Sequence, residues 1–286
     1  MSYSRPARGP LRGNRQNTHR SRANAQQKPA AASSWNEVAD WYSQHLNGPQ
    51  TFQKTIIFPG ALAMLEPKAN GRYLDIACGE GSFLRLLRSR VREAELYGID
   101  AAPELIAHAE QTTRQDKRLH LQVADAQTFS RFIPPQSIDG ATCLMAIQNI
   151  EHIDRVFQEA AKSLVHGAPL IIVMNHPCFR APQQSGWGFD DARKIQYRRM
   201  DRYLSPYAQP IIAHPGAAPS VKTISYHRPI AVYVRALRNA GFTVDAMEEW
   251  VSDRMSDSGP RAKAENIARN EFPLFLAIRA RKTKTT

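Results

Sequence analysis

The sequence predicts an α/β fold in which a mostly parallel β-sheet is covered by helices on both faces. From residue 71 onward, short apolar segments of strand length alternate with longer amphipathic segments, a pattern typical of such sheets. The chain of 286 residues is long enough to bury a substantial core. No stretch approaches the roughly 18 apolar residues of a membrane span, and no signal-peptide pattern is expected.

Helical structure is expected to begin near Ser34. Ser34 and Glu37 form a capping box, in which each side chain can bond a backbone N–H at the start of a helix. A second amphipathic segment covers residues 51–67 and is closed by Pro67, which cannot continue a helix. We therefore expect two helices before the first strand, within residues 33–70.

Strands and helices then alternate along the chain. The predicted strands are residues 72–78, 95–100, 119–125, 137–147, 168–175, 243–250 and 272–280. The predicted helices are residues 81–91, 102–115, 155–165 and 225–242. Pro229 lies near the start of the last helix, and Gly241 is placed to cap its C-terminus. No internal repeat is evident.

Residues 176–226 interrupt this alternation. They contain six prolines and many aromatic and basic residues, and connections of this length are uncommon without a function. The aromatic and basic side chains could stack bases and hold phosphates. They could equally form a cap over a flat or anionic small molecule, or an amphipathic helix with a solvated charged face.

The positive charge of the chain is concentrated near its ends. The formal net charge is +12, but residues 1–34 hold seven Arg and Lys and no acid, and residues 279–286 hold four more. The remainder is therefore close to neutral. Residues 1–32 have almost no large apolar side chain and are expected to be disordered. They could be an RNA-contacting arm, an organelle transit segment or a solubilising tail.

The three cysteines are widely spaced and give neither a disulfide framework nor the spacing of a zinc site. We therefore expect a reducing, cytoplasmic environment and no metal. The oligomeric state is left open by the sequence.

The turn after the first predicted strand carries the strongest chemical signal. Asp75 lies near the end of this strand, and the small residues Ala77, Gly79 and Gly81 follow before a helix opens. Such a turn lets the backbone approach a ligand in front of a helix N-terminus. A dinucleotide fingerprint would need a third glycine where Leu84 stands, and Asp75 would repel a pyrophosphate. An acid at this place suits a cationic ligand better.

Two further acids recur at intervals of 25 residues, because Asp100 and Asp125 also end predicted strands. In an open parallel sheet, ligands bind at the carboxyl ends of the strands. Each Asp alone could simply cap the following helix. Three carboxylates in register with a glycine turn fit a ligand with an ammonium group, a ribose diol and an exocyclic amine, which is S-adenosylmethionine.

These residues resemble the class I S-adenosylmethionine-dependent methyltransferases, of the methyltransferase type 11/25-like kind. The resemblance covers roughly residues 35–175 and 227–281, and residues 73–81 are similar to the first motif of the family, D-x-G-x-G-x-G. Ala77 replaces the first glycine of this motif. The resemblance implies a Rossmann-like, seven-stranded sheet whose last strand is antiparallel, and the segment from Phe272 to Lys282 fits that strand.

The resemblance also implies a set of cofactor contacts. Asp75, with the backbone of the turn, would hold the methionine part, and Asp100 the ribose hydroxyls. Asp125 would take the adenine amine, with the Ala126 N–H on the ring. The full set implied is Asp75, Ala77, Gly79, Gly81, Asp100, Ala101, Asp125, Ala126, Ile147 and Gln148. The early helix with Trp41 and Tyr42 resembles a lid over the cofactor, or is packed by core aromatics.

The candidates for the acceptor side are His176, Asn175 and His227. Asn175 and His176 follow the fifth predicted strand, where the methyl group should emerge, and a histidine there could act as a base or orient the acceptor. His227 begins the late predicted helix, in a segment similar to one that small-molecule methyltransferases place beside the acceptor. His152 is a further candidate. Cys178 is disfavoured as a nucleophile, because no Pro-Cys turn follows the fourth strand.

The sequence therefore predicts methyl transfer from S-adenosylmethionine to an oxygen, nitrogen or carbon atom of a small organic molecule. An RNA methyltransferase that uses residues 1–32 and the Arg/Tyr-rich insertion is the first alternative. A non-catalytic binding module on the same scaffold is the second. The predicted organisation is a basic arm (1–32), a methyltransferase domain (33–281) with lid helices (33–70) and an acceptor-side insertion (176–226), and a basic tail (282–286).

Overall fold

The computed structural model describes residues 35–36, 48, 50–212 and 222–283. The predictions for residues 1–32 and for most of the helix expected from Ser34 lie outside the described residues. No helix in these ranges is long and apolar enough to cross a membrane.

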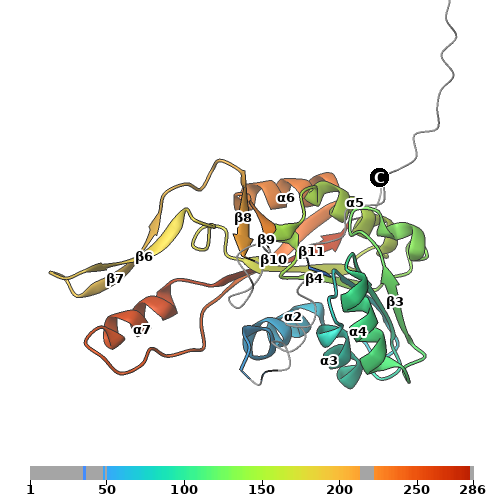
Figure 1. Cartoon of the computed structure of the whole chain (residues 1–286). Coiled ribbons are helices and arrows are strands. Elements are labelled where there is room, and N and C mark those ends of the chain that lie inside the picture. Colours follow the sequence, from blue (N-terminus) through green and yellow to red (C-terminus); the bar gives the residue numbers. More distant parts are fainter. Residues whose placement is uncertain (1–34, 37–47, 49, 213–221, 284–286) are drawn as a thin grey trace, which may run out of the picture. The chain divides into compact units, whose positions relative to one another are not determined.

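Seven strands form one sheet in the order β10-β11-β5-β4-β1-β2-β3 (Figure 1). The strands are β1 Arg72–Ile76, β2 Glu95–Asp100, β3 Leu119–Val123, β4 Gly140–Leu144, β5 Pro169–Asn175, β10 Phe242–Trp250 and β11 Phe275–Lys282. β11 runs antiparallel to both of its neighbours, β5 and β10, and the pairs among β1 to β5 are parallel. The predicted fold class is confirmed.

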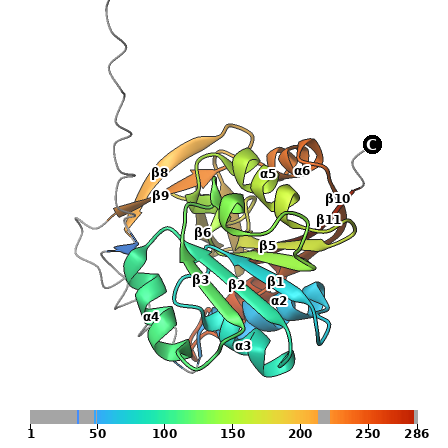
Figure 2. The ribbon, with the colours of Figure 1, turned by 90° about the vertical axis from the view of Figure 1, so that its right-hand side faces the viewer.

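Helices connect the strands and cover both faces of the sheet. They are η2 Gln53–Ile57 (a π-helical turn), α2 Phe58–Leu65, α3 Ser82–Arg90, α4 Pro103–Thr113, α5 Ile153–Ser163, α6 Ile230–Asn239 and α7 Ala262–Glu271, with 3-10 turns η3 Phe129–Phe132 and η4 Ile147–Asn149. Figure 2 shows α5 and α6 on one side of the sheet and α2 and α3 on the other. This arrangement leaves the carboxyl ends of the parallel strands at one edge.

The central strands are buried on both faces, which explains their nearly continuous apolar sequences. In β5, Leu170 and Ile172 belong to the core that packs against α5 and α6. Ile171 and Val173 belong to the core that packs against α2 and α3. The sheet therefore separates two apolar cores, and both fix the positions of the strand ends.

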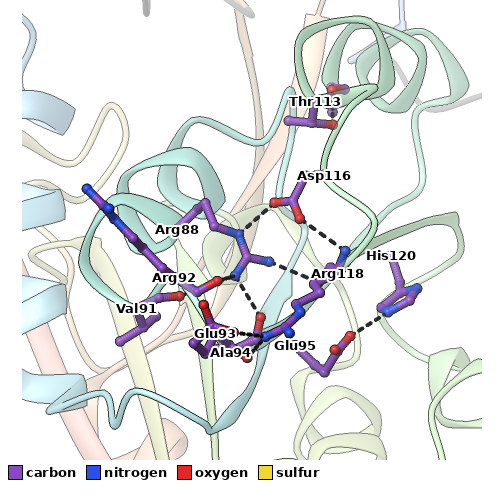
Figure 3. Close-up of polar contacts among 11 residues, drawn as sticks. Arg88, Val91, Arg92, Glu93, Ala94, Glu95, Thr113, Asp116, Arg118 and His120 are labelled. Carbon is purple, nitrogen blue, oxygen red and sulfur yellow. Dashed lines mark hydrogen bonds and ion pairs between the residues drawn. The ribbon is translucent and has the colours of Figure 1, made fainter.

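One guanidinium group ties together the opposite edge, where β2 and β3 begin (Figure 3). The Nε of Arg88 donates to the Oδ2 of Asp116 at 2.6 Å. Its Nη groups donate to the carbonyl oxygens of Val91, Arg92, Ala94 and Arg118. Arg88 thus holds the end of α3 against the loops that precede both strands.

Replacing Arg88 by Ala should lower the free energy of unfolding by about 2–3 kcal/mol, because it removes an ion pair and the donor that the Arg92 and Ala94 carbonyl groups share. Urea denaturation followed by circular dichroism measures the change. Arg92→Ala is the control, because the Arg92 side chain is exposed and Arg88 contacts only its carbonyl. Arg92→Ala should lower the free energy of unfolding by less than about 0.5 kcal/mol. Equal decreases in the two variants would contradict this role of Arg88.

Two β-hairpins occupy much of residues 176–226, so the interpretation of this insertion as an amphipathic helix is wrong. β6 (Ser185–Asp190) pairs with β7 (Ile195–Met200), and β8 (Tyr207–Ile212) pairs with β9 (Lys222–His227). The ring of Trp187 contacts Phe272 after α7, and the β6–β7 hairpin lies beside α7 (Figure 1). Nothing in the sequence reading anticipated α7.

The late helix and the C-terminal end differ from the sequence-based expectation. α6 begins at Ile230 rather than at residue 225, because residues up to His227 complete β9. β11 extends to Lys282, the first residue of the predicted basic tail. Arg279 and Arg281 lie in this strand and form ion pairs with Asp245. Half of the basic residues counted in 279–286 are therefore part of the folded sheet and have acidic partners.

Candidate functional site

The turn between β1 and α3 has an unusual backbone conformation. Ala77, Gly79 and Gly81 all have positive φ, at 58°, 56° and 78°. This left-handed region favours glycine and carries a steric cost for alanine. The conformation therefore explains why the motif has glycine at the position that Ala77 occupies. The Cys78 N–H donates to the Ile99 carbonyl at 2.9 Å and anchors the turn on β2.

Asp75 lies beside this turn and is 3% exposed. Its Oδ1 accepts a hydrogen bond from the Thr142 hydroxyl on β4 at 2.6 Å. Burial raises the pKa of Asp75 to about 7; the Thr142 hydrogen bond opposes this shift, and the nearby Asp100 carboxylate adds to it. With Ala77 and Gly79, Asp75 lines a cavity of about 40 Å³ that Phe58 and Met145 also line.

Asp100, at the end of β2, joins the glycine turn to the start of α4. Its Oδ2 accepts the Gly79 N–H at 2.9 Å, and its Oδ1 accepts the Ala102 N–H at 2.8 Å. Burial raises the pKa of Asp100, and these backbone hydrogen bonds oppose the rise. Asn36, from the described start of the N-terminal region, accepts the Glu104 N–H in the first turn of α4.

The other predicted cofactor residues follow β2, β3 and β4. Ala101 and Asp125 are exposed, and Ala126 is buried. Asp125 accepts the backbone N–H of Gln127 at 2.8 Å. Ile147 and Gln148 are buried in η4, and the Gln148 Nε2 donates to the Met145 carbonyl. The structure thus joins the turn to Asp100 by a hydrogen bond, places Asp75 on the same small cavity as Ala77 and Gly79, and arranges the rest along the same edge.

Three buried side-chain atoms of the described residues have no hydrogen-bond partner: Gln127 Oε1, Gln148 Oε1 and Arg228 Nη1. Buried polar atoms are nearly always paired, so each of these calls for an explanation. Gln127 and Gln148 lie at the strand ends implied for the cofactor, and sequence reasoning missed Gln127. With the buried carboxylates of Asp75 and Asp100, these acceptor atoms fit a ligand that carries a cation and several donors, as S-adenosylmethionine does.

Comparisons with known proteins agree with this geometry. A family model described as a methyltransferase domain matches residues 74–167, from β1 to the loop before β5. A solved S-adenosylmethionine-dependent methyltransferase from Mesorhizobium loti is similar, with a TM-score of 0.61, 26% sequence identity, and coverage of 78% of this chain and 96% of that chain. This chain contains a methyltransferase domain and has the fold of the class I S-adenosylmethionine-dependent methyltransferases.

Curated relatives are similar to this chain over a shorter part of its length. An uncharacterized methyltransferase of Emericella nidulans is 27% identical over 182 residues, which cover 55% of this chain and 64% of the relative. A demethylmenaquinone methyltransferase of Thermus thermophilus is 26% identical over 137 residues, which cover 48% of this chain and 59% of the relative. The chain thus spans about three-fifths of the length of these two relatives.

On the acceptor side, Asn175 is exposed at the end of β5, whereas His176 is 1% exposed. Both ring nitrogens of His176 are engaged. Nδ1 accepts the Cys178 N–H at 3.2 Å, which places the proton of the neutral ring on Nε2, and Nε2 then donates to the Glu249 carboxylate at 2.7 Å. Burial lowers the pKa of His176, and Glu249 opposes this. Of the two roles expected for His176, this geometry favours orientation over proton abstraction.

His176→Ala should lower turnover, because the turn that follows β5 loses its link to β10. The affinity for the cofactor should stay nearly unchanged, since the hydrogen bonds of the His176 ring go to Glu249 and to the turn after β5. Initial rates, a titration with S-adenosylmethionine and a melting curve measure these effects together. Glu249→Gln is the partner variant and should reproduce part of the loss. Wild-type turnover in His176→Ala would show that His176 only shapes the turn after β5 and has no role in catalysis.

His227 ends β9 instead of beginning a helix, and its surroundings are aromatic. Its Nε2 donates to the Tyr203 carbonyl at 2.7 Å, and its ring stacks on Tyr207 at 4.8 Å. Burial lowers the pKa of His227, although the Tyr203 hydrogen bond opposes this. Cys178 is half-buried near the Tyr203 hydroxyl. His227 stays a candidate for the acceptor side, although at least one of its ring nitrogens is already committed.

Proposed function

We propose that this chain transfers the methyl group of S-adenosylmethionine directly to an oxygen, nitrogen or carbon atom of a small organic molecule. One observation carries the proposal: the two buried carboxylates of Asp75 and Asp100 flank the glycine turn, and the hydrogen bonds they accept come from a hydroxyl and from backbone N–H groups. Buried carboxylates without a cationic partner are costly. A ligand that brings its own positive charge would remove this cost.

The residues of the site have binding and positioning roles in this proposal. The bound cofactor supplies an electrophilic methyl group on a sulfonium, so alignment of the nucleophile is the main task left to the protein. Asp100 would accept hydrogen bonds from the ribose hydroxyls, and Asp75 would face the ammonium group. Gln127 and Gln148 would accept donors of the cofactor. The segments after β4 and β5 would then border the acceptor.

A small acceptor is supported by the burial of the side chains on that side, since His176 and His227 are almost inaccessible to a macromolecule. The relative from Thermus thermophilus carries the name of a small-molecule methyltransferase. RNA is the second candidate, because residues 1–34 hold seven Arg and Lys and no acid. A non-catalytic binding module is the third, and it gives no reason for the chain to retain two costly buried carboxylates.

One incubation separates these candidates. The full chain is mixed with methyl-labelled S-adenosylmethionine and a cell extract, which is then divided into RNA, protein and small-molecule fractions. Asp100→Ala serves as the inactive control. We expect label in the small-molecule fraction only. Label in RNA, lost when residues 1–32 are deleted, would overturn the proposal in favour of the second candidate. No label in any fraction would favour the third.

A further inference from the structure

Arg228 is a buried cation at the acceptor side of the site. It follows β9 directly and is 8% exposed. Its Nη2 donates to the carbonyl oxygens of Ile150 and Glu151, and its guanidinium lies over the ring of Tyr226, 5.1 Å from the centroid. Two carbonyl groups and a ring stabilise the charge only in part, because none of them is an anion.

The position of Arg228 links it to the predicted cofactor contacts. Ile150 and Glu151 follow η4, the turn that contains Ile147 and Gln148, and β9 packs against this turn. Arg228 therefore stands one loop away from the residues implied for the cofactor, at the edge where the methyl group would emerge. α6 begins two residues later, and the partial positive charge at its N-terminus adds to that of the guanidinium.

The Nη1 group of Arg228 has no acceptor within the described part of the chain. Tyr233 is a polar neighbour of Arg228: burial raises the pKa of Tyr233, and the charge of the guanidinium and a hydrogen bond with it oppose the rise. Nη1 itself has no hydrogen-bond partner among the described residues. A buried guanidinium N–H without an acceptor is costly. This energetic cost would be removed if an oxygen atom of the substrate accepted the hydrogen bond from Nη1.

We propose that Arg228 Nη1 binds a carboxylate of the methyl acceptor, distinct from the atom that is methylated. The inference rests on the proposed function and narrows its substrate class to small organic acids. A carboxylate is favoured over a neutral oxygen because the guanidinium has no anionic partner among the residues that the structure describes, and such charge-assisted bonds are about twice as strong. The phosphates of a polynucleotide are disfavoured, because a side chain that is 8% exposed is out of their reach.

The first test examines the labelled small-molecule product of the wild-type full chain. Coupling to aniline with a carbodiimide changes the mass of the product only if it carries a free carboxyl group. We expect the anilide. A labelled product without a carboxyl group would overturn the inference while leaving the proposed function intact. If no small molecule is labelled at all, the proposed function fails, and the inference fails with it.

The second test separates substrate binding from a structural role. Arg228→Lys keeps the positive charge but not the planar set of donors. It should raise KM for the purified acceptor at least 10-fold, while the affinity for S-adenosylmethionine changes less than about twofold. Arg235→Met, an exposed position on α6, is the control and should behave as wild type. If Arg228→Lys lowers the melting temperature and kcat but leaves KM unchanged, Arg228 only holds the loop after η4, and the inference is wrong.

Discussion

Asp100→Ala should weaken the binding of S-adenosylhomocysteine by roughly 100-fold. Two hydrogen bonds between ribose hydroxyls and a carboxylate contribute about 1.5 kcal/mol each, and the loss of about 3 kcal/mol corresponds to two orders of magnitude in Kd. The substitution also removes the acceptor of the Gly79 and Ala102 N–H groups, at 2.9 and 2.8 Å. The turn that would contact the cofactor should therefore become less ordered. Equilibrium dialysis with labelled ligand measures the change.

Two further variants separate charge from shape at this position. Asp100→Asn keeps the size of the side chain and one acceptor oxygen, so it should lose about 10-fold in affinity. Asp257→Ala removes an exposed carboxylate on another part of the chain and should leave Kd unchanged. If a folded Asp100→Ala variant bound S-adenosylhomocysteine within threefold of the wild-type affinity, Asp100 would not be part of the cofactor site.

The second large effect concerns pH and Asp75. Its pKa is raised from 3.8 to about 7 in the folded chain. A carboxyl group with a raised pKa contributes stability that is fully present below pH 3.8 and is lost as the pH rises through about 7. The chain without ligand should therefore become less stable over this window, by on the order of 4 kcal/mol from this group.

A cationic ligand beside Asp75 should bind more tightly as the pH rises, because its charge favours the carboxylate form of Asp75. The affinity for S-adenosylmethionine should rise between pH 5.5 and 7, by up to about tenfold per pH unit. Titrations at several pH values measure the slope. Asp75→Asn should flatten the profile, since asparagine does not titrate and can still accept the Thr142 hydrogen bond. A pH-independent Kd in the wild-type chain would show that Asp75 does not face the cation.

The parallel sheet could be predicted because its strands are buried on both faces. The apolar runs in β1 and β5 have no polar face to interrupt them, and the amphipathic helices between them leave few other topologies. The same property made the site visible in the sequence. Acids at the ends of buried strands, such as Asp75 and Asp100, are conspicuous among apolar residues.

The hairpins of the insertion were not predicted, because the composition of their strands obscures the two-residue alternation that is typical of a β-strand. Trp187 and Phe189 alternate with Gly186 and Gly188 in β6, and this period of two is a strand signal. The basic residues in and around β7, such as Lys194, Arg198 and Arg199, favoured a helical interpretation instead. The turn between β6 and β7 contains Lys194 at φ 54°, a left-handed conformation that a lysine in the sequence does not predict.

α7 and Arg228 could not be predicted for a different reason. Ala268 is the one buried residue of α7, so this helix has almost no apolar face to reveal it. The role of Arg228 depends on the Ile150 carbonyl, 78 residues away in the chain. Local patterns contain no information about such a contact, and the unpaired nitrogen became apparent only from the folded chain.

Calorimetric titration of the wild-type full chain at pH 7.5 with S-adenosylmethionine, and separately with NAD⁺, tests the central claim most directly. We expect one S-adenosylmethionine per chain with a Kd near the micromolar range, or about −8 kcal/mol. No heat of binding is expected for NAD⁺, because Asp75 opposes a pyrophosphate and Leu84 stands where a third glycine would be. Absence of S-adenosylmethionine binding at about 1 mM, or tighter binding of NAD⁺, would contradict the account.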